Sequence, residues 1–174
     1  MNVEFERVDV PRDQDQLVEF LCRDEWPFHG RRQMTPDDVL AMDFSSPDVC
    51  SFWIVDSGQT VGLVRLLDLC DIGEGAPLFD LRIASRHRGC GVGRRATGWI
   101  ADHLFASYPD LHRIEANTRG DNAAMQRLLS GAGFTHEGRL RNAWRSDDGQ
   151  WFDTMIYGML RTDWSSAGDA RGWR

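Results

Sequence analysis

The sequence predicts a mixed α/β fold in which a mostly antiparallel sheet contains one splayed parallel pair of strands and is flanked by helices. Two pairs of β-rich runs are each separated by a short turn-forming segment, as in antiparallel hairpins. Between them lie a strand, a tight glycine-rich loop, a long helical pattern and a further strand, which indicates one parallel crossover. At 174 residues, with 41% hydrophobic and 27% charged residues, the chain suits one globular domain. We expect that domain to span residues 1–164 and residues 165–174 to form a flexible tail.

The first half of the chain is expected to supply a strand, two helices and a hairpin. The alternating segment VEFERVDV predicts the strand, and a polar turn precedes the first helical stretch. Thr35 followed by Pro36 is typical of the N-cap and first residue of a short second helix. The expected ranges are Val3–Val10 for the strand, Gln14–Cys22 for the first helix, and Phe52–Asp56 with Thr60–Leu67 for the hairpin.

The second half is expected to contain the crossover, another helix and a second hairpin. Pro109 ends the long helix, and Gly131 and Gly133 mark the end of the next one. The turn-forming segment SDDGQ separates the last two strands. The expected ranges are Leu78–Ala84 and His112–Thr118 for the crossover strands, Gly91–Ser107 and Asp121–Ser130 for the helices, and Phe134–Trp144 with Trp151–Leu160 for the hairpin.

The composition narrows the class of partner. A net charge of -7 argues against nucleic-acid binding, which needs clustered basic residues, and suits a cationic or amine-bearing substrate. No apolar run reaches the roughly 20 residues that cross a bilayer, and the chain starts without a basic cluster or an apolar leader region. We therefore expect a cytoplasmic protein without membrane contact. The four cysteines lie far apart and lack metal-ligand spacing, so no metal is expected.

A glycine-rich loop from Arg88 to Arg94 stands where a predicted strand passes into a helix. The first N–H groups of a helix lack partners and its dipole favours anions, while glycines let the main chain approach phosphate oxygens. The arginines at both ends add positive charge. The loop therefore favours phosphate binding, although glycines in such a place also serve a simple tight turn.

The same glycines allow a second interpretation. Residues 91–96 match the pattern G-x-G-x-x-A of dinucleotide-binding loops, which would indicate a nicotinamide or flavin enzyme. That pattern belongs near the start of a doubly wound sheet, whereas here antiparallel hairpins flank a single crossover. We therefore keep the nicotinamide or flavin enzyme only as the least favoured alternative.

The loop and the downstream helix resemble the GNAT acetyltransferase superfamily. Arg88, Gly91 and Gly93 match its acetyl-CoA signature. In this signature a Gln or Arg is followed by a Gly three residues later and by a Gly or Ala five residues later. The stretch from Asn122 to Phe134 is similar to the family's asparagine-initiated helix, which ends in Gly-Phe. Residues further on resemble the branch that contains ribosomal-protein-alanine acetyltransferases. They are Glu137–Arg141, Gly149, Trp151, Asp153, Tyr157 and Trp164.

The resemblance implies an acyltransferase that moves the acetyl group of acetyl-CoA to a primary amine by direct attack on the thioester. The cofactor would lie between the splayed strands 79–84 and 112–118. The implied acceptors are a protein N-terminus or a small amine such as a polyamine or aminoglycoside, and relatives of this branch often form homodimers. The implied cofactor-binding residues are Ile83 and Ala84 for the pantetheine, Arg88, Gly89, Cys90, Gly91, Val92, Gly93 and Arg94 for the pyrophosphate, and Asn122 with Met125 for the cofactor arm.

The candidate general base is Glu115, because Glu115 and Asn117 share one face of their strand and either side chain can order a water. The alternative is that Glu115 is an exposed strand carboxylate or a structural partner of Arg113 or Arg139. Several relatives carry a carboxylate at the position of Asn117 and a tyrosine at that of Leu129. Because this sequence has neither, a non-catalytic acyl-CoA-binding regulatory module is an alternative. The loop after the first helix is expected to line the acceptor pocket through Glu25, Trp26, Phe28 and His29.

Overall fold

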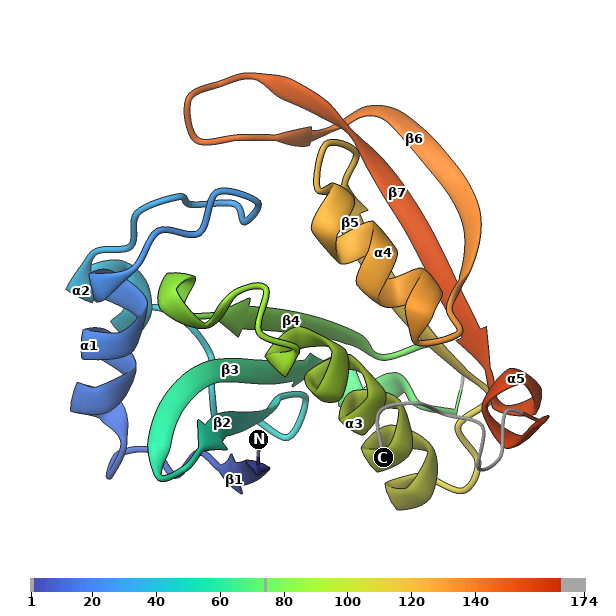
Figure 1. The fold of residues 1–174 in the computed structure, drawn as a ribbon, viewed down its shortest axis with the longest axis horizontal. Helices are drawn as coiled ribbons and strands as arrows, with labels where there is room; N and C mark the ends of the chain where they lie inside the picture. The colour runs from blue at the N-terminus through green and yellow to red at the C-terminus, as the bar shows by residue number, and fades with distance from the viewer. Residues whose placement is uncertain (1, 74, 167–174) are drawn as a thin grey trace.

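The computed structural model describes residues 2–73 and 75–166, which form two antiparallel sheets and five α-helices (Figure 1). The first sheet has the strand order β1-β2-β3-β4 and the second the order β5-β7-β6. The strands are β1 (Val3–Arg7), β2 (Cys50–Asp56), β3 (Gln59–Leu67), β4 (Leu78–Ile83), β5 (Arg113–Arg119), β6 (Thr135–Arg145) and β7 (Trp151–Leu160). The helices are α1 (Gln14–Arg23), α2 (Pro36–Leu40), α3 (Val92–Ser107), α4 (Ala123–Gly131) and α5 (Arg161–Ser166). The predicted mixed α/β class is confirmed.

Local sequence signals account for the first hairpin and for the start of α2. Only Ser57 and Gly58 lie between β2 and β3, and both have positive φ, 52° and 75°. Two such residues make the turn whose twist matches that of antiparallel strands. At the start of α2, the Thr35 side chain accepts a hydrogen bond from the Asp38 N–H, and the Asp38 carboxylate accepts one from the Thr35 N–H. This reciprocal capping box confirms the predicted N-cap.

Alternate residues of β2 divide the core between the two faces of the first sheet. Phe52 and Ile54 pack in one cluster with the apolar side of α3. Trp53 and Val55 pack in a second cluster with α1 and the loop after it. Helices therefore cover both faces of this sheet, which is why β2 is buried along most of its length.

Strands β4 and β5 follow one another through α3 but belong to different sheets. Next to β4, the Pro77 carbonyl accepts a hydrogen bond from the Glu115 N–H of β5 (3.0 Å). Beyond this point the strands diverge, and Figure 1 shows α4 between β4 and the β6–β7 hairpin. The expected splayed pair is therefore present, and the sheet divides in two at that pair. A strand edge beside such a gap offers N–H and C=O groups to a ligand.

Helix α5 has no counterpart among the predicted elements. The guanidinium of its first residue, Arg161, donates to the carbonyls of Phe105 (3.1 Å), Tyr108 (2.6 Å) and Leu111 (2.8 Å). These carbonyls lie at or just after the end of α3, where a helix has unpaired acceptors. Helix α5 extends through Ser166, into the segment expected to be a tail, and residues 167–174 lie outside the described residues. The expectation of one domain over residues 1–164 stays a prediction.

None of the helices in residues 2–73 and 75–166 is long and apolar enough to cross a membrane. Over the same residues, no group of three or more His, Cys, Asp or Glu side chains is arranged to hold a metal ion. The expected cytoplasmic location stays a prediction.

Candidate active site

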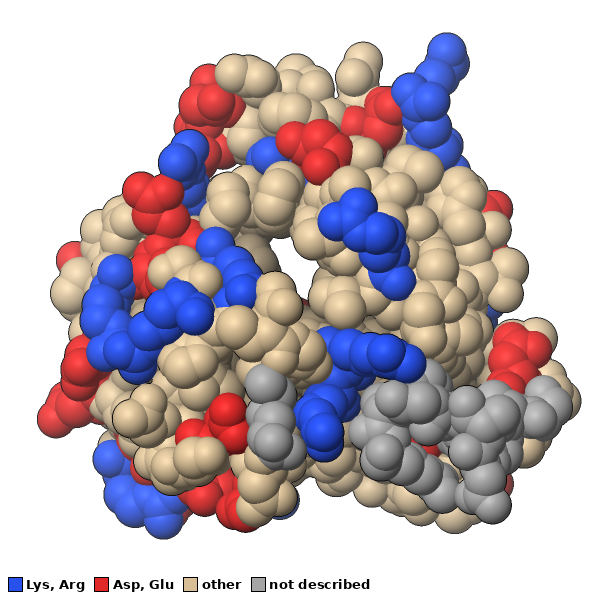
Figure 2. All heavy atoms as spheres, viewed as in Figure 1, with Lys and Arg blue, Asp and Glu red and all other residues tan. Residues whose placement is uncertain are grey.

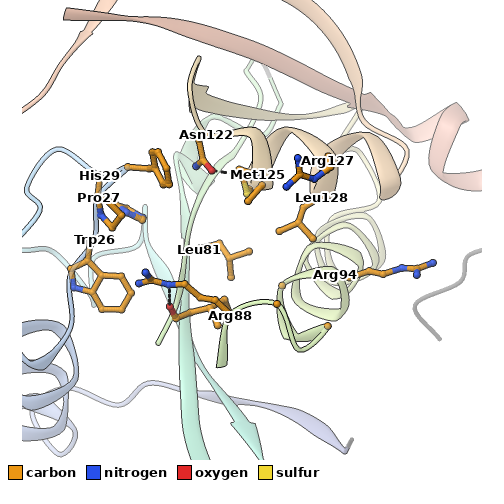
Figure 3. A pocket seen from close by; sticks show the side chains of 16 residues that line it. Trp26, Pro27, His29, Leu81, Arg88, Arg94, Asn122, Met125, Arg127 and Leu128 are labelled. Atoms are coloured by element: carbon orange, nitrogen blue, oxygen red, sulfur yellow. Dashed lines mark hydrogen bonds between the residues drawn. The ribbon is translucent and has the colours of Figure 1, made fainter. Parts of the chain in front are cut away.

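A cleft of about 470 Å³ opens where β4 separates from β5. Its walls come from four parts of the chain: the loop between α1 and α2, the edge of β4, the loop that begins α3, and one face of α4 (Figure 3). The structure thus brings together segments that are far apart in the sequence. The predicted site residues that line the cleft are Trp26, Phe28, His29, Ile83, Arg88, Gly89, Gly91, Gly93, Arg94, Asn122 and Met125.

The first turn of α3 has N–H groups that the helix itself does not use. Gly91 is the N-cap, and the first main-chain bond of the helix runs from the Arg95 N–H to the Gly91 carbonyl (3.2 Å). The N–H groups of Val92, Gly93 and Arg94 precede that bond and have no acceptor within the helix. Because Gly91 and Gly93 both line the cleft, the positive end of the α3 dipole lies at its wall.

The loop before α3 presents an uncrowded main-chain surface. Gly89 and Gly91 have positive φ, 77° and 86°, a region that L side chains rarely adopt. No heavy atom lies within 4 Å of an ideal Cβ on either glycine. Arg88, Arg94 and Arg127 line the cleft around this loop, although the Arg94 side chain extends away from the other labelled side chains in Figure 3. The loop therefore fits a compact anion in both shape and charge.

Asn122 and Gly93 determine how α4 meets the start of α3. The Asn122 Oδ1 accepts from the Met125 N–H (3.2 Å), and its Nδ2 donates to the Thr118 Oγ1 (3.2 Å). Asn122 is therefore the N-cap of α4, and its side chain already has two partners. A Cβ on Gly93 would stand 3.0 Å from the Leu128 Cδ1, so this glycine permits the close approach of the two helices. The apolar side of α4 then forms a wall of the cleft.

Ile83 and Ala84 use their main-chain groups differently. The Ala84 N–H donates to the Val61 carbonyl (3.0 Å) of β3, and its carbonyl accepts from the His87 N–H (2.8 Å). In an antiparallel ladder, successive residues direct their main-chain groups to opposite sides. Ile83 therefore faces the gap, where its carbonyl accepts from the Arg88 Nε (2.9 Å). Of the two residues predicted to pair with pantetheine, Ile83 is the one whose main chain faces the cleft.

The loop between α1 and α2 is fastened to the segment after β4. The Asp24 carboxylate accepts from the Ser85 N–H, and the Arg88 guanidinium donates to the Glu25 carbonyl (2.8 Å). Burial raises the pKa of Asp24, but hydrogen bonds from the N–H groups of Ser85 and Glu25 outweigh it, and the pKa is lowered. Arg88 also lies 5.6 Å from the centre of the buried Trp26 ring. These contacts hold one wall of the cleft against the glycine-rich loop.

Two contacts join that same loop to the second sheet. The Arg119 guanidinium of β5 lies against the rings of Phe28 (5.0 Å) and Phe152 (4.0 Å). The Arg32 N–H donates to the Asp147 carboxylate in the β6–β7 turn (2.9 Å). Figure 2 shows an opening through the molecule, with basic side chains along its border. An opening of this kind can be approached from two sides.

Residues 18–134 match the model of the Acetyltransferase (GNAT) family, and this range includes the glycine-rich loop, α3, β5 and α4. The chain belongs to the GNAT acetyltransferase family. Members of this family are acyltransferases that use acetyl-CoA, so the enzyme class and the donor predicted from the loop are confirmed. The nicotinamide interpretation of the same glycines does not fit this family.

Solved structures share the GNAT fold of this chain. One is Mycobacterium smegmatis RimJ in complex with CoA-disulfide, with a TM-score of 0.74 and 21% identity over 92% of this chain and 83% of that chain. Another is the ribosomal-protein-S5-alanine acetyltransferase from Vibrio fischeri, with a TM-score of 0.77 and 20% identity over 94% and 96%. A third is the spermidine/spermine N-acetyltransferase SpeG from Vibrio cholerae, with a TM-score of 0.75 and 18% identity over 96% and 97%. At sequence identities of 18–21%, the similarity to these three proteins shows a shared fold and nothing more specific.

The two predicted catalytic residues of this GNAT protein lie on β5, outside the described lining of the cleft. The Glu115 Oε1 accepts from the Arg113 Nε (2.9 Å), and the Arg113 guanidinium also forms an ion pair with Glu137. The hydrogen bond with Glu137, together with that to Glu115, outweighs burial and raises the pKa of Arg113 above its usual range. Asn117 is exposed. The structure does not bring either side chain to the cleft, and their catalytic roles stay predictions.

Three more predicted residues lie beside the cleft rather than in its lining. The Glu25 carboxylate is held in an ion pair with an arginine of its own loop (2.8 Å). Cys90 is exposed, and its thiol donates to the Arg88 carbonyl (3.6 Å). Val92 is buried in the core beneath the loop. Only the main chain of Val92 is therefore available to a ligand, through its N–H group.

Five lining residues had not been predicted, namely Pro27, Leu81, Ala124, Arg127 and Leu128. Ala124, Arg127 and Leu128 have the spacing of one face of a helix, so the predicted N-cap of α4 contained the signal for them. Leu81 lies two positions before the predicted residue Ile83, so both side chains are on the same face of the strand. Pro27 lies within the aromatic loop segment that was already expected to line the acceptor pocket.

Proposed function

We propose that this GNAT protein transfers the acetyl group of acetyl-CoA to the primary amine of a peptide N-terminus or of a small amine. One observation carries the proposal: a single cleft unites the N–H groups at the start of α3, which have no acceptor within the helix, with the edge of β4 that faces away from β3. The first feature suits a pyrophosphate and the second suits an amide-bearing chain. The amine would approach from the other side of the opening seen in Figure 2.

Coenzyme A fits the residues around the cleft. Negative charge on its pyrophosphate would be stabilised by the N–H groups that begin α3 and by the guanidinium of Arg88. The amides of its pantetheine arm can pair with the edge of β4 at Ile83, while Asn122 and Met125 border the arm from α4. Bound acetyl-CoA supplies a thioester whose carbonyl carbon the amine attacks.

Charge pairing near the opening favours an acceptor with one positive charge. Four carboxylates on the bordering elements lie within ion pairs, whereas a polyamine gains most from several unpaired carboxylates. The pairs are Asp24 with Arg88, Glu25 with Arg32, Asp121 with Arg119 and Asp153 with Arg139. A peptide N-terminus brings a single ammonium group on a partly apolar chain, which suits the aromatic wall of Trp26 and Phe28. We therefore rank a peptide amine ahead of a polyamine or an aminoglycoside.

The acceptor must lose a proton before it attacks. A peptide N-terminal amine with a pKa of about 7.7–8.0 needs only roughly 1 kcal/mol to lose its proton at pH 7. A polyamine-like or lysine-like amine with a pKa near 10.4 is neutral in about one molecule in 2,500, which corresponds to roughly 4.6 kcal/mol. Glu115 as base and Asn117 as a ligand of an ordered water remain proposals, supported by their shared face on the strand that borders the gap. The exposed position of Asn117 suits a water ligand.

A binding and turnover experiment tests the proposed function. Calorimetry should show binding of acetyl-CoA and no binding of NADH. Thiol release should then accompany acetylation of peptides with a free N-terminus, and a matched peptide with a blocked N-terminus serves as the control. All 20 basic residues counted as Lys or Arg are arginine, so acetylation of the enzyme's own lysines cannot contribute to the signal. Binding of acetyl-CoA without turnover on any peptide, polyamine or aminoglycoside would contradict catalysis and favour a regulatory module.

We also propose a cytoplasmic setting, where acetyl-CoA is available, and a homodimer as the assembly. Sedimentation at micromolar protein concentration tests the second point. A monomer under those conditions would contradict the homodimer without affecting the proposed reaction.

A further inference from the structure

Arg127 is an exposed residue of α4 that lines the cleft beside the start of α3. Its neighbour Leu128 meets that start, because an ideal Cβ on Gly93 would stand 3.0 Å from the Leu128 Cδ1. Figure 3 shows the side chains of Arg127 and Leu128 next to one another on α4. Asn122 and Met125, which border the proposed pantetheine arm, lie nearer the beginning of the same helix. Arg127 therefore lies towards the end of the cleft at which α3 begins.

The guanidinium of Arg127 has no partner within residues 2–73 and 75–166, where it takes part in no hydrogen bond or ion pair. Arginines on other elements around the opening do have partners. Arg32, Arg119 and Arg139 pair with the carboxylates of Glu25, Asp121 and Asp153. An exposed guanidinium without a carboxylate partner has its N–H groups available to an anionic ligand.

The two segments that meet at this end of the cleft contain basic residues and no acidic ones. Residues 81–101 include five arginines, and residues 122–136 include Arg127, but neither segment has an Asp or Glu. The chain as a whole has a net charge of -7. The sign of the charge is therefore reversed at the start of α3 and along the neighbouring part of α4, which favours the approach of anions.

Coenzyme A carries a phosphate group in addition to its pyrophosphate. This group is a monoester at the 3′ position of the ribose, and a phosphate monoester has a charge of about −1.5 to −2 at pH 7. The pyrophosphate already has proposed donors in the N–H groups of residues 92–94 and in the Arg88 guanidinium. The ribose follows the pyrophosphate on the side away from the thioester. Its 3′-phosphate would therefore lie beyond the start of α3, at the outer end of the cleft.

We propose that Arg127 binds the 3′-phosphate of coenzyme A, so that the enzyme distinguishes acetyl-CoA from its 3′-dephospho form. This inference rests on the proposed function, in which the pyrophosphate lies at the start of α3. A guanidinium can donate two parallel hydrogen bonds to one phosphate group, and a doubly charged monoester gains more from it than a singly charged diester. Main-chain groups of α3 and a side chain of α4 would thus recognise separate phosphates of one cofactor.

Arg94 is the other candidate for this phosphate. It is exposed, lines the same cleft and has no partner for its guanidinium within the described parts of the chain. In Figure 3 its side chain extends away from the other labelled side chains, whereas Arg127 lies among the residues of α4 that face the loop. We therefore assign the larger contribution to Arg127.

Calorimetry with coenzyme A and with 3′-dephospho-coenzyme A tests the assignment without any turnover. The wild-type protein should bind coenzyme A about tenfold more tightly, as expected for one charge-assisted pair at an exposed site. In Arg127→Gln this preference should fall to about twofold, while affinity for the dephospho form stays at the wild-type value. Arg127→Lys keeps a positive charge without the fork of donors and should retain part of the preference. Thermal unfolding should be unchanged in both variants.

Arg95→Gln is the matched control. Arg95 is an exposed residue of α3 outside the described lining of the cleft, so this variant removes the same charge and should keep the wild-type preference. Equal wild-type affinity for the two ligands would overturn the role of Arg127 and leave the proposed function intact. An equal loss for both ligands in Arg127→Gln, or a preference lost only in Arg94→Gln or lost equally in Arg95→Gln, would also overturn that role. Binding of neither ligand to the wild-type protein would instead overturn the proposed function, and the inference with it.

Discussion

Replacement of Gly91 by alanine should weaken acetyl-CoA binding through the main chain alone. Gly91 has a φ of 86°, and no heavy atom lies within 4 Å of an ideal Cβ, so the added methyl group meets no steric clash. An L residue held in a left-handed conformation costs about 1–2 kcal/mol. If the loop of the free variant relaxes and must return to this conformation to direct the N–H groups of α3 at the pyrophosphate, affinity should fall about 5- to 30-fold.

Gly58→Ala is the matched control for this measurement. Gly58 also has a positive φ, 75°, and open space around an ideal Cβ, but it lies in the β2–β3 turn. Only Gly91→Ala should lose affinity in calorimetry with coenzyme A, whereas Gly58→Ala should keep its affinity and show the strain as a loss of folding stability in urea titrations. Wild-type affinity in Gly91→Ala, or an equal loss in Gly58→Ala, would refute the assignment of the loop.

Three further predictions concern the fold and the acceptor wall. The hydrogen bond from Arg12 outweighs burial and lowers the pKa of Asp13 from 3.8 to about 2, so Asp13→Asn should cost about 2 kcal/mol of unfolding free energy at pH 7. The pKa of Asp13 is lower in the folded than in the unfolded protein, so the ionised carboxylate stabilises the fold at pH values above the unfolded-state pKa. The stability difference between wild type and Asp13→Asn should therefore shrink as the pH falls from about 5 to about 2. A stability difference that does not change with pH would contradict this prediction. Arg161→Met removes three hydrogen bonds to carbonyls near the end of α3 and should lower the unfolding free energy measured in urea by about 2 kcal/mol. An unchanged unfolding free energy would contradict a stabilising role for these hydrogen bonds. Phe28→Ala should raise the acceptor KM about tenfold, because it removes an aromatic ring of the acceptor wall that lies against Arg119. The affinity for acetyl-CoA should stay constant. A loss of acetyl-CoA affinity with an unchanged acceptor KM would place Phe28 on the donor side of the cleft.

Local signals made much of the fold predictable. The turn at Ser57 and Gly58, the capping box at Thr35 and the N-cap Asn122 each act within a few residues, so each can be read from the sequence. The glycine-rich loop is equally local, since its shape depends on left-handed glycines and on the start of one helix. The hairpins, α3, α4 and the loop that faces the cleft were therefore predictable.

Features that depend on distant contacts were not predictable. Helix α5 is short, and its first residue binds carbonyls about fifty residues earlier in the chain. The pair of His29 with Asp80 joins a loop to a strand 51 residues away, and no pattern in either segment indicates the other. Glu115 was chosen from strand alternation, which also places Arg113 beside it, but alternation does not show that Arg113 is paired with Glu137, 24 residues further on. The sequence thus shows which residue types lie near a site, whereas the contacts that these residues make are known only once the fold is known.

The structure of the complex with acetyl-CoA tests the central assignment most directly. We predict pyrophosphate oxygens within about 2.7–3.2 Å of the N–H nitrogens that begin α3, at Val92, Gly93 and Arg94. We also predict the pantetheine arm along the edge of β4 at Ile83. A pyrophosphate bound away from the start of α3, with the loop unchanged by the cofactor, would contradict the account.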